Sequence, residues 1–523
     1  MTTGAEEIVA ALEEAGVELC FGLPGVHNLA LWEALRQSPI RLVGVRHEQA
    51  AAYAADGYAR ATGRIGVALT TTGPGAANTL GAVGEAWASR SPVLVIATDI
   101  PTTLRREGVY RGVLHETSGQ AAMFAPVVKA SFSGPRQAAL AISTAMGDPV
   151  RPVYLEVATD LLRTPSTGYE DRVSRVAIGS AGGPLVQAER PLIWAGGGAR
   201  DLRDDVVALA ERLGAPVIET YQGRGVMPLG HPLRVGFPPH VPAVGRLWDE
   251  ADLVVSVGSD LDGMNTQNWA MPQPPRLVAV NVDPDDAAKN YEVDAVLPSC
   301  DLLLGEDEGE SEPWADLAAV RSEACRALDG RALRFLDALQ FALPHDAVVV
   351  CDMCIPGYWI GGFHPFPAPR KLLYPVGWGT LGFGFPAAIG AALGAGPAAP
   401  TVAICGDGGF LFACGELATV AQEQVGLTTV IVDDGGYGML RFDQDRAGVP
   451  RFGVDLVTPD FEALARSFGV RAQTVDDLDD AFGEALAEHV ADPAPSVLVA
   501  RAEALVPPPT TSPQWYRRPA EPR

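Results

Sequence analysis

Short apolar runs followed by glycine-rich turns recur along this chain of 523 residues. The clearest case begins at residues 402–405, an apolar run long enough for one buried strand. The turn Gly406-Asp407-Gly408-Gly409 follows at once, residues 410–424 have helical spacing, and residues 428–432 form a second apolar run. The pattern predicts one unit made of a strand, a glycine turn, a helix and a strand.

An acidic residue follows each strand of this unit: Asp407 after the first, and Asp433-Asp434 after the second. In a parallel sheet both strand ends lie at one edge, which is where ligands bind. Carboxylates there can hold a hard cation, and the free N–H groups at a helix start can hold phosphate. The alternative is an ordinary strand–helix–strand unit with polar loops, because a Gly-Asp-Gly turn alone is a weak signal.

The same order of elements occurs near the start of the chain. Residues 67–99 and 402–434 are both 33 residues long and run strand, glycine turn, helix, strand, Asp without gaps in register. Four further strands are predicted between them, at 191–194, 216–219, 253–257 and 277–283. We therefore predict an α/β fold with three consecutive domains and mainly parallel sheets, at 1–165, 185–305 and 331–505, with a tail at 506–523.

Composition and charge limit the possible functions. The formal net charge of −25 argues against binding nucleic acid or an anionic membrane. Residues 372–405 carry no charge, but Gly and Pro recur among them, so we expect a buried helix and loops rather than a membrane span.

Cys351 and Cys354 are expected to be buried thiols. The first residues have no basic n-region of a signal peptide, so we expect a cytoplasmic protein.

Glu48 is a second candidate for chemistry. It follows an apolar run and begins an alanine-rich helix, so its carboxylate is expected to face a small, dry space. The alternative is an ordinary acidic residue at a helix start, stabilised by the helix dipole. The next apolar run is followed by the glycine turn Gly73-Pro74-Gly75 and by Asn78.

These motifs together resemble those of thiamin-diphosphate enzymes, in the acetolactate synthase-like and 2-keto acid decarboxylase branch. The family's diphosphate-binding motif runs from Gly-Asp-Gly to an Asn-Asn pair, as residues 406–434 do with Asp-Asp at the end. The block around Glu48 resembles the family's pyrimidine-binding domain. The resemblance covers nearly the whole chain, in the order pyrimidine-binding, central and diphosphate-binding domain.

The resemblance implies an enzyme that uses thiamin diphosphate and Mg²⁺ to act on a small 2-keto acid. In this family the cofactor ylid adds to the keto carbon, CO₂ leaves, and the enamine is protonated or adds to an aldehyde or keto acceptor. The carboligase branch is favoured. A simple decarboxylase or a C–C lyase on the same fold stays open, and so does a non-catalytic cofactor-binding protein.

The resemblance also gives roles to individual residues. Glu48 would hydrogen-bond the aminopyrimidine ring, and Leu381 would support the bent cofactor. The Mg²⁺ ligands would be the side chains of Asp407 and Asp434 and the carbonyl of Gly436. His115 is a candidate proton donor near the substrate, with Gln120 as a second candidate. The other expected cofactor contacts are Gly25, Gly73, Asn78, Gly379, Gly408, Gly409, Phe410, Tyr437, Gly438 and Met439.

The chain also departs from the family pattern. Asp434 stands where an amide is expected, and the added negative charge would either tighten metal binding or weaken diphosphate binding. Residues 259–263, Ser-Asp-Leu-Asp-Gly, replace an Arg-containing run of the FAD-binding synthases, so FAD is possible but not expected. In this family the site lies between two chains, which implies a homodimer or homotetramer.

Overall fold

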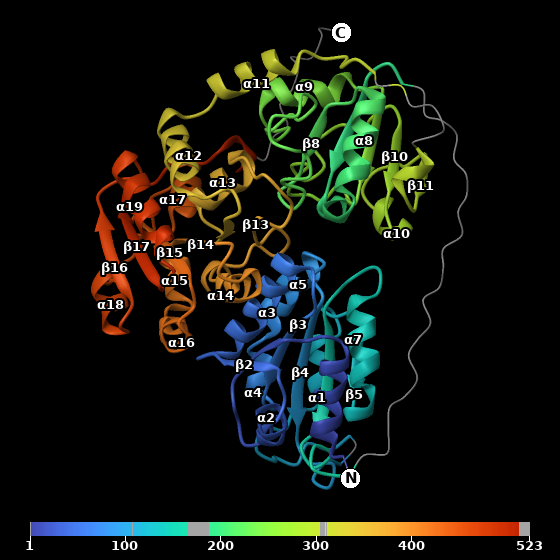
Figure 1. Cartoon of the computed structure of the whole chain (residues 1–523), viewed down its shortest axis with the longest axis vertical. Helices are drawn as coiled ribbons and strands as arrows, with labels where there is room; N and C mark the ends of the chain where they lie inside the picture. Colours follow the sequence, from blue (N-terminus) through green and yellow to red (C-terminus); the bar gives the residue numbers. More distant parts are fainter. Residues whose placement is uncertain (1, 107, 166–187, 304–308, 310, 512–523) are drawn as a thin grey trace.

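The computed structural model describes residues 2–106, 108–165, 188–303, 309 and 311–511 and contains three sheets, one in each lobe of the molecule (Figure 1). All strand pairs in these sheets are parallel. The predicted α/β architecture is therefore confirmed, while the domain boundaries stay predictions. Most of the predicted tail at 506–523 lies outside the described residues.

The N-terminal lobe is built on a six-stranded sheet with the order β2-β1-β3-β4-β6-β5. Its strands are β1 (Leu19–Gly22), β2 (Arg41–Gly44), β3 (Gly66–Thr70), β4 (Val93–Asp99), β5 (Ser131–Ser133) and β6 (Val153–Ala158). Its helices are α1 (Gly4–Glu14), α2 (Leu29–Arg36), α3 (Glu48–Thr62), α4 (Pro74–Ala77), α5 (Leu80–Ala88), α6 (Gln120–Phe124) and α7 (Ala138–Met146), with the short η1 (Pro135–Gln137).

The C-terminal lobe repeats this topology. Its sheet has the order β13-β12-β14-β15-β17-β16, so each strand takes the place of its counterpart in the N-terminal sheet. Its strands are β12 (Val348–Cys351), β13 (Leu372–Leu373), β14 (Thr401–Gly406), β15 (Leu427–Asp433), β16 (Arg471–Val475) and β17 (Ser496–Arg501). Its helices are α13 (Ile355–Phe363), α14 (Gly384–Ala395), α15 (Asp407–Leu411), η4 (Cys414–Glu416), α16 (Leu417–Glu423), α17 (Gly438–Arg446), α18 (Phe461–Ser467) and α19 (Asp480–Ala491). The internal similarity expected for 67–99 and 402–434 is confirmed by β3–β4 and β14–β15.

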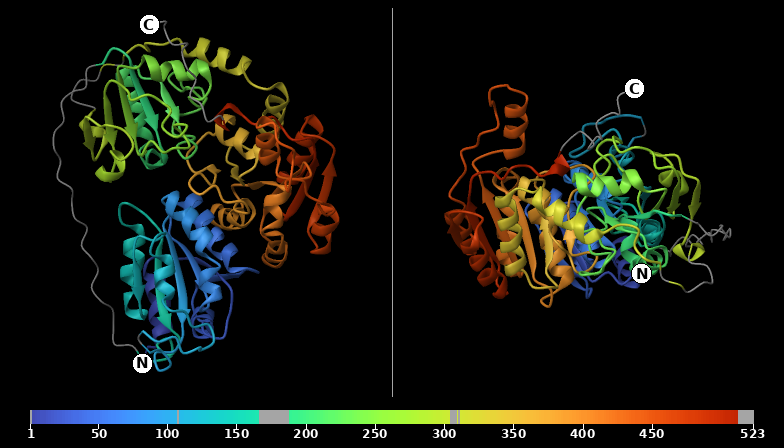
Figure 2. Two further views of the ribbon diagram at one scale, coloured as in Figure 1. Left: turned by 180° about the vertical axis from the view of Figure 1, so that it is seen from behind. Right: turned by 90° about the horizontal axis from the view of Figure 1, so that it is seen from above.

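The central lobe has a five-stranded sheet with the order β11-β10-β9-β7-β8. Its strands are β7 (Pro191–Ala195), β8 (Val217–Glu219), β9 (Leu253–Val257), β10 (Leu277–Val280) and β11 (Ala295–Leu297), and its helices are η2 (Gly197–Asp201), α8 (Arg203–Leu213), α9 (Pro242–Glu250), α10 (Pro284–Ala287) and η3 (Cys300–Leu302). Helices α11 (Leu317–Arg326) and α12 (Gly330–Ala342) lead from this lobe to the C-terminal lobe (Figure 2, yellow). The chain end carries η5 (Pro509–Thr511).

The prediction of a single helix at 410–424 is wrong. The segment forms α15, η4 and α16 instead, and it ends at Gln424, which has a φ of 49°. The break has a tertiary cause: both carboxylate oxygens of Glu416 accept N–H groups from the chain just before α3. The strand predicted at 277–283 is also shorter, because β10 ends at Val280.

Helix α14 is the helix of the uncharged segment at 372–405, and it packs against α3 of the N-terminal lobe (Figure 1). The two backbones approach closely because glycines face carbonyl groups. A Cβ atom at Gly57 would collide with the carbonyl of Ala387, and one at Gly390 would collide with that of Ala54. No helix among the described residues is long and apolar enough to cross a membrane.

Candidate active site

Three carboxylates follow three neighbouring strands of the C-terminal sheet. Asp352 follows β12, Asp407 follows β14, and Asp434 follows β15. These strands are adjacent and parallel, so the residues after them lie at one edge of the sheet. The sequence predicted this place for Asp407 and Asp434. It also contained the same signal for Asp352, an acid directly after the apolar run of β12, whose role was not recognised.

A cavity of about 150 Å³ lies at this edge. Its described lining falls entirely between residues 352 and 440. The site residues expected from the sequence that line it are Leu381, Asp407, Gly408, Gly409, Asp434, Gly436, Tyr437, Gly438 and Met439. The structure therefore brings together most of the expected diphosphate and metal contacts.

Asp407 has an unsatisfied oxygen in this cavity. Its Oδ1 accepts the N–H of Gly408 at 2.6 Å, while its buried Oδ2 has no partner in the described structure. Burial raises the pKa of Asp407 to about 7, the N–H of Gly408 opposes this shift, and the nearby Asp434 adds to it. Burial likewise raises the pKa of Asp434 to about 6. A cation between the two carboxylates would relieve both costs.

The donor set suits Mg²⁺, which prefers hard oxygen ligands and keeps some water or substrate oxygens in its shell. Two carboxylates and the carbonyl of Gly436 meet this description. The described residues contain no cluster of three or more His, Cys, Asp or Glu side chains that could hold a metal. A metal here would therefore need oxygens from the backbone, a cofactor or water.

Glycines make room for this arrangement. A Cβ atom at Gly408 would lie 2.6 Å from the ring of Tyr437, and one at Gly438 would lie 2.7 Å from Oδ2 of Asp434. The side chain of Phe410 does not face the cavity, because its ring packs in the core against that of Phe385, with ring centroids 5.1 Å apart. Only the backbone of Phe410 is left to bind a ligand.

Asp352 joins two parts of the cavity wall. Its carboxylate is buried and accepts the N–H of Gly382 at 2.9 Å, next to the expected support residue Leu381. A Cβ atom at Gly409 would lie 2.5 Å from its Oδ2. Asp352 therefore holds the loop with Leu381 against the glycine turn. Both Cys351 and Cys354 are free thiols; Cys351 is buried as expected, whereas Cys354 is only half-buried.

The expected residues of the first domain gather in the N-terminal lobe. Glu48 begins α3, is 8% exposed, and its Oε2 accepts the amide N–H of Asn78 at 3.0 Å. A Cβ atom at Gly75 would lie 3.3 Å from its Oε1, so the glycine turn closes around the carboxylate. Gly73 has a φ of 64°, in the region that favours glycine.

Gln120 is buried and supports this turn. Its Oε1 accepts the N–H of Gly73 at 2.6 Å, and its Nε2 donates to the carbonyl of Thr98 at 2.9 Å and to the hydroxyl of Tyr154 at 2.8 Å. These contacts occupy its amide, which favours a positioning role over contact with substrate.

His115 lies beside the same turn. Its backbone approaches Gly73, and its ring stands edge-on to that of His27 with centroids 5.5 Å apart. Gly25 is packed against Thr71, whose Oγ1 would lie 2.5 Å from a Cβ atom at that position. Among the described residues, none of these N-terminal groups lines the cavity around Asp407.

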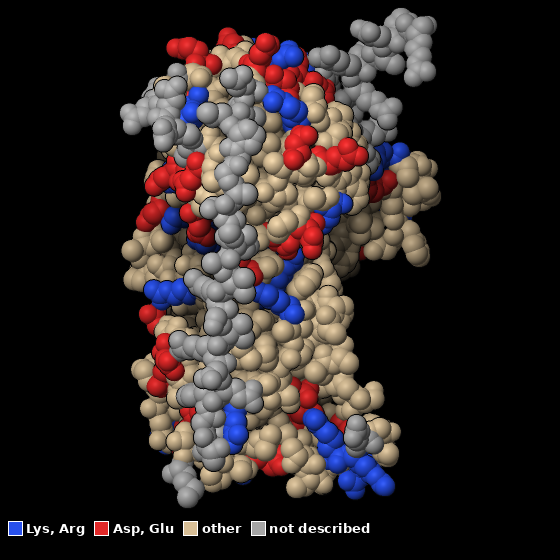
Figure 3. Space-filling view, turned by 90° about the vertical axis from the view of Figure 1, so that its right-hand side faces the viewer, with Lys and Arg blue, Asp and Glu red and all other residues tan. Residues whose placement is uncertain are grey.

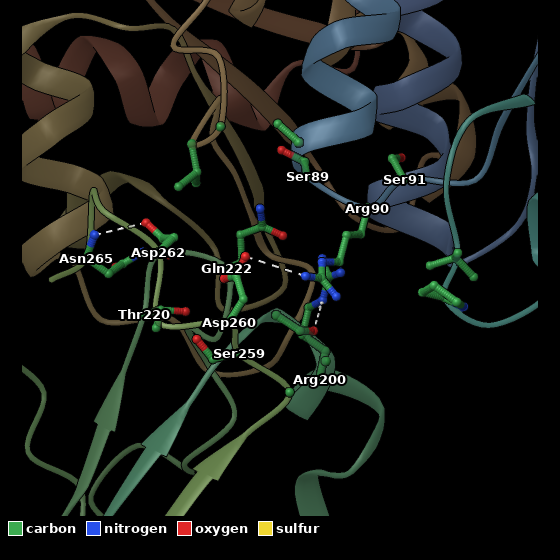
Figure 4. A pocket seen from close by; sticks show the side chains of 18 of the residues that line it. Ser89, Arg90, Ser91, Arg200, Thr220, Gln222, Ser259, Asp260, Asp262 and Asn265 are labelled. Carbon is green, nitrogen blue, oxygen red and sulfur yellow. Dashed lines mark hydrogen bonds and ion pairs between the residues drawn. The ribbon is translucent and has the colours of Figure 1, made fainter. Parts of the chain in front are cut away.

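A second, larger cavity of about 930 Å³ is lined by all three lobes (Figure 4). Gly379 lines this cavity rather than the smaller one. The segment that was compared with the FAD-binding run contributes Asp260, which pairs with Lys289 at 2.7 Å and with Arg90 at 3.5 Å. Half-buried Asp262 adds a second carboxylate, and Arg200 lines the same cavity. The cavity therefore carries side chains of both charges, and the expectation that FAD is not used stays a prediction.

Comparison with known proteins agrees with the geometry. The model of the thiamine pyrophosphate enzyme N-terminal TPP binding domain matches residues 2–123, that of the central domain 181–301, and that of the C-terminal TPP binding domain 354–500. A probable 2-ketoarginine decarboxylase of Pseudomonas aeruginosa is 34% identical, with 91% of this chain and 90% of the relative covered.

Two further relatives are synthases. A probable acetolactate synthase large subunit of Methanocaldococcus jannaschii is 30% identical, with 92% of this chain and 90% of the relative covered. An acetolactate synthase of Mycobacterium avium is 30% identical, with 93% and 85% covered. The chain is thus an enzyme that belongs to the thiamine pyrophosphate enzyme family, in its acetolactate synthase-like branch.

Proposed function

We propose that the protein uses thiamin diphosphate and Mg²⁺ to remove CO₂ from a 2-keto acid and to transfer the remaining acyl group to a second carbonyl compound. The observation that carries this proposal is the unsatisfied Oδ2 of Asp407, a residue that lines the same cavity as Asp434, Gly408 and Gly409 at the edge of the C-terminal sheet. The relatives named acetolactate synthase support the transfer step. The relative named 2-ketoarginine decarboxylase favours a second candidate, decarboxylation without transfer.

In this proposal the C-terminal lobe holds the charged end of the cofactor. Asp407, Asp434 and the carbonyl of Gly436 bind Mg²⁺, and the backbone around Gly408 and Gly409 donates N–H groups to the diphosphate. Leu381, which lines the same cavity, would support the cofactor, and Asp352 fixes the loop that carries Leu381. Bound thiamin diphosphate supplies the nucleophile and the electron sink for breaking the bond to the carboxylate.

In this proposal the N-terminal lobe supplies the side chains that hold and donate protons. Glu48 would hold a proton against the aminopyrimidine ring of the cofactor, and its buried position would strengthen that hydrogen bond. Asn78 orients the Glu48 carboxylate, and Gln120 holds the turn at Gly73. His115 donates a proton near the substrate, from the side of the same turn.

Two chains complete one site. The supporting observation is that the cavity around Asp407 has no described lining residue from the N-terminal lobe. Exposed apolar side chains lie next to both groups of site residues: Val26 is 80% exposed beside Gly25, while Phe412 and Leu440 are half or more exposed beside α15 and α17. Such surfaces are typical of contacts between chains. The minimal assembly in this proposal is a homodimer.

The test begins with calorimetric titration of the purified protein by thiamin diphosphate, with and without Mg²⁺. Binding is expected only with the metal, and it should be lost after dialysis against EDTA and recovered on adding Mg²⁺. No heat and no thermal protection at millimolar ligand would contradict the proposal. The visible spectrum of the same protein checks the prediction that no flavin is bound.

A panel of 2-keto acids then separates the reactions. Each acid is supplied with and without an aldehyde acceptor, and the products are identified by mass spectrometry. A coupled product supports transfer, whereas CO₂ and a free aldehyde support the second candidate. Cofactor binding without turnover of any acid would instead identify a non-catalytic binding protein.

A further inference from the structure

Arg441 on α17 lies against the metal-binding loop. Its Nη1 donates to the carbonyl of Asp434 at 2.8 Å and lies 3.5 Å from Oδ1 of the same residue. Its Nη2 donates to the carbonyl of Gly435, and its Nε donates to Oδ1 of Asp455 at 2.7 Å. Only 14% of the Arg441 side chain is exposed. The guanidinium is therefore held by four oxygens, and two of them belong to Asp434.

The loop is shaped to receive this guanidinium. A Cβ atom at Gly436 would collide with Nη2 of Arg441, so only glycine leaves the space. A neighbouring segment supports the loop from the other side: the N–H of Leu456 donates to the carbonyl of Gly435 at 2.9 Å, and the N–H of Tyr437 donates to the carbonyl of Val454 at 2.9 Å. The cation next to Asp434 is thus part of the fold rather than a loose surface side chain.

The position matters because of the charge on Asp434. The family motif ends in two amides, whereas this chain has two carboxylates. With Asp407 and a bound diphosphate, a site of this kind would collect several negative charges around one divalent cation, and like charges close together oppose binding. A half-buried guanidinium beside the additional carboxylate removes much of that repulsion.

We propose that Arg441 is a positioning residue that offsets the charge of Asp434, so that the thiamin diphosphate anion can bind beside a carboxylate where the family motif has an amide. This inference rests on the proposed function. It predicts different effects on the binding of the cofactor and on the binding of Mg²⁺. Loss of the Arg441 charge weakens binding of the cofactor anion, but it does not weaken binding of Mg²⁺ alone, because the apo site becomes more negative.

The test uses Arg441→Gln, Arg441→Lys, Asp434→Asn and the double variant Asp434→Asn/Arg441→Gln. The dissociation constant of thiamin diphosphate at saturating Mg²⁺ should rise about tenfold in Arg441→Gln and return to near the wild-type value in the double variant. Arg441→Lys, which keeps the charge, should lie between these values. The dissociation constant of Mg²⁺ without cofactor should be unchanged or lower in Arg441→Gln.

The matched control is Arg446→Gln. Arg446 lies on the same helix, is half-exposed, and pairs with Asp443 at 3.0 Å away from the loop. Its replacement should leave both constants unchanged. Thermal melting of each variant in the absence of ligands checks that all are folded.

Each outcome decides between the alternatives. If Arg441→Gln binds the cofactor as wild type does, or if Asp434→Asn fails to rescue it, Arg441 only supports the loop and the inference is overturned. Weaker binding of Mg²⁺ in Arg441→Gln would overturn it in the same way. If the wild-type protein itself binds no thiamin diphosphate, the proposed function fails, and this is seen before any variant is compared.

Discussion

Glu48 and Asn78 form a small polar unit inside an apolar setting. One carboxylate oxygen of Glu48 is bound by the amide of Asn78, and the other faces the turn at Gly75. The helix behind Glu48 is packed with buried alanines, which keep water away from the carboxylate. A hydrogen bond made in such a place is stronger than one made at the surface. This arrangement suits a group that shares a proton with a cofactor ring.

Replacing Glu48 by Gln tests this role. We expect turnover of the 2-keto acid to fall by roughly 10²–10⁴, the usual contribution of a positioned acid or base. The affinity for thiamin diphosphate should change far less, because the diphosphate is bound elsewhere. Steady-state kinetics and calorimetry measure the two effects separately. Glu33→Gln, at an exposed ion pair with Arg36, is the control. A variant with normal turnover would contradict the role of Glu48.

Some of the individual site residues could be predicted from the sequence and others could not. Asp407 and Asp434 were predictable because each follows an apolar run, and that local pattern places a side chain at a sheet edge. Asp352 carried the same signal. Arg441 and Glu416 had none, because their partners come close only in the folded chain: backbone N–H groups for Glu416, and backbone carbonyls and two carboxylates for Arg441. Charge compensation and contacts between lobes depend on the tertiary structure.

Elements are held together here by small residues as much as by large ones. Helices α3 and α14 join the N-terminal and C-terminal lobes, and glycines at their contact allow backbone to meet backbone. A buried ion-pair cluster reinforces the same junction: Arg60 of α3 binds Asp56 and Glu85 and donates to the carbonyl of Tyr374. The N–H of Trp378 donates to Glu85, so this cluster also holds the loop that leads to Leu381.

Gly390→Ala tests the close contact. The added Cβ atom would meet the carbonyl of Ala54, and overpacking of this kind typically costs about 1–3 kcal/mol. We expect a lower melting temperature, read by calorimetry. Gly330→Ala is the matched control, since a Cβ atom at that first position of α12 has nothing within 4 Å. Equal melting temperatures of the two variants would show that α3 and α14 separate easily.

The order of elements was predictable, but their packing was not. Apolar runs and glycine turns gave the strands on both sides of each turn, and the similarity of 67–99 and 402–434 reappears as one strand order in two sheets. The helix at 410–424 was predicted as continuous because its spacing is helical throughout. The helix is interrupted at Glu416, whose carboxylate accepts the N–H groups of Arg46 and His47 just before α3, a contact between residues far apart in sequence.

Within one chain, the site residues of the N-terminal lobe and those of the C-terminal lobe do not line a common cavity around Asp407. The carboxylates of the C-terminal lobe surround a cavity without described residues of the N-terminal lobe, while Glu48 lies in that lobe. On the face shown in Figure 3, acidic and basic side chains are interspersed over much of the described surface. The prediction that nucleic acid is not a partner rests on the formal net charge of −25. Phe452 and Val457, which follow α17, are almost fully exposed and extend the apolar surface near the site.

Complementation between inactive variants tests a shared site directly. Glu48→Gln disables the N-terminal contribution, and Asp407→Ala disables the C-terminal one. If each site takes one lobe from each of two chains, a heterodimer of the two variants has one site with both changes and one site with neither. Equal co-expression makes about half of the dimers heterodimers, so about a quarter of the wild-type activity should return. If each chain holds its own complete site, no activity returns, because every chain then carries one disabling change. Each variant expressed alone is the control, and sedimentation confirms that the mixture contains dimers or larger assemblies.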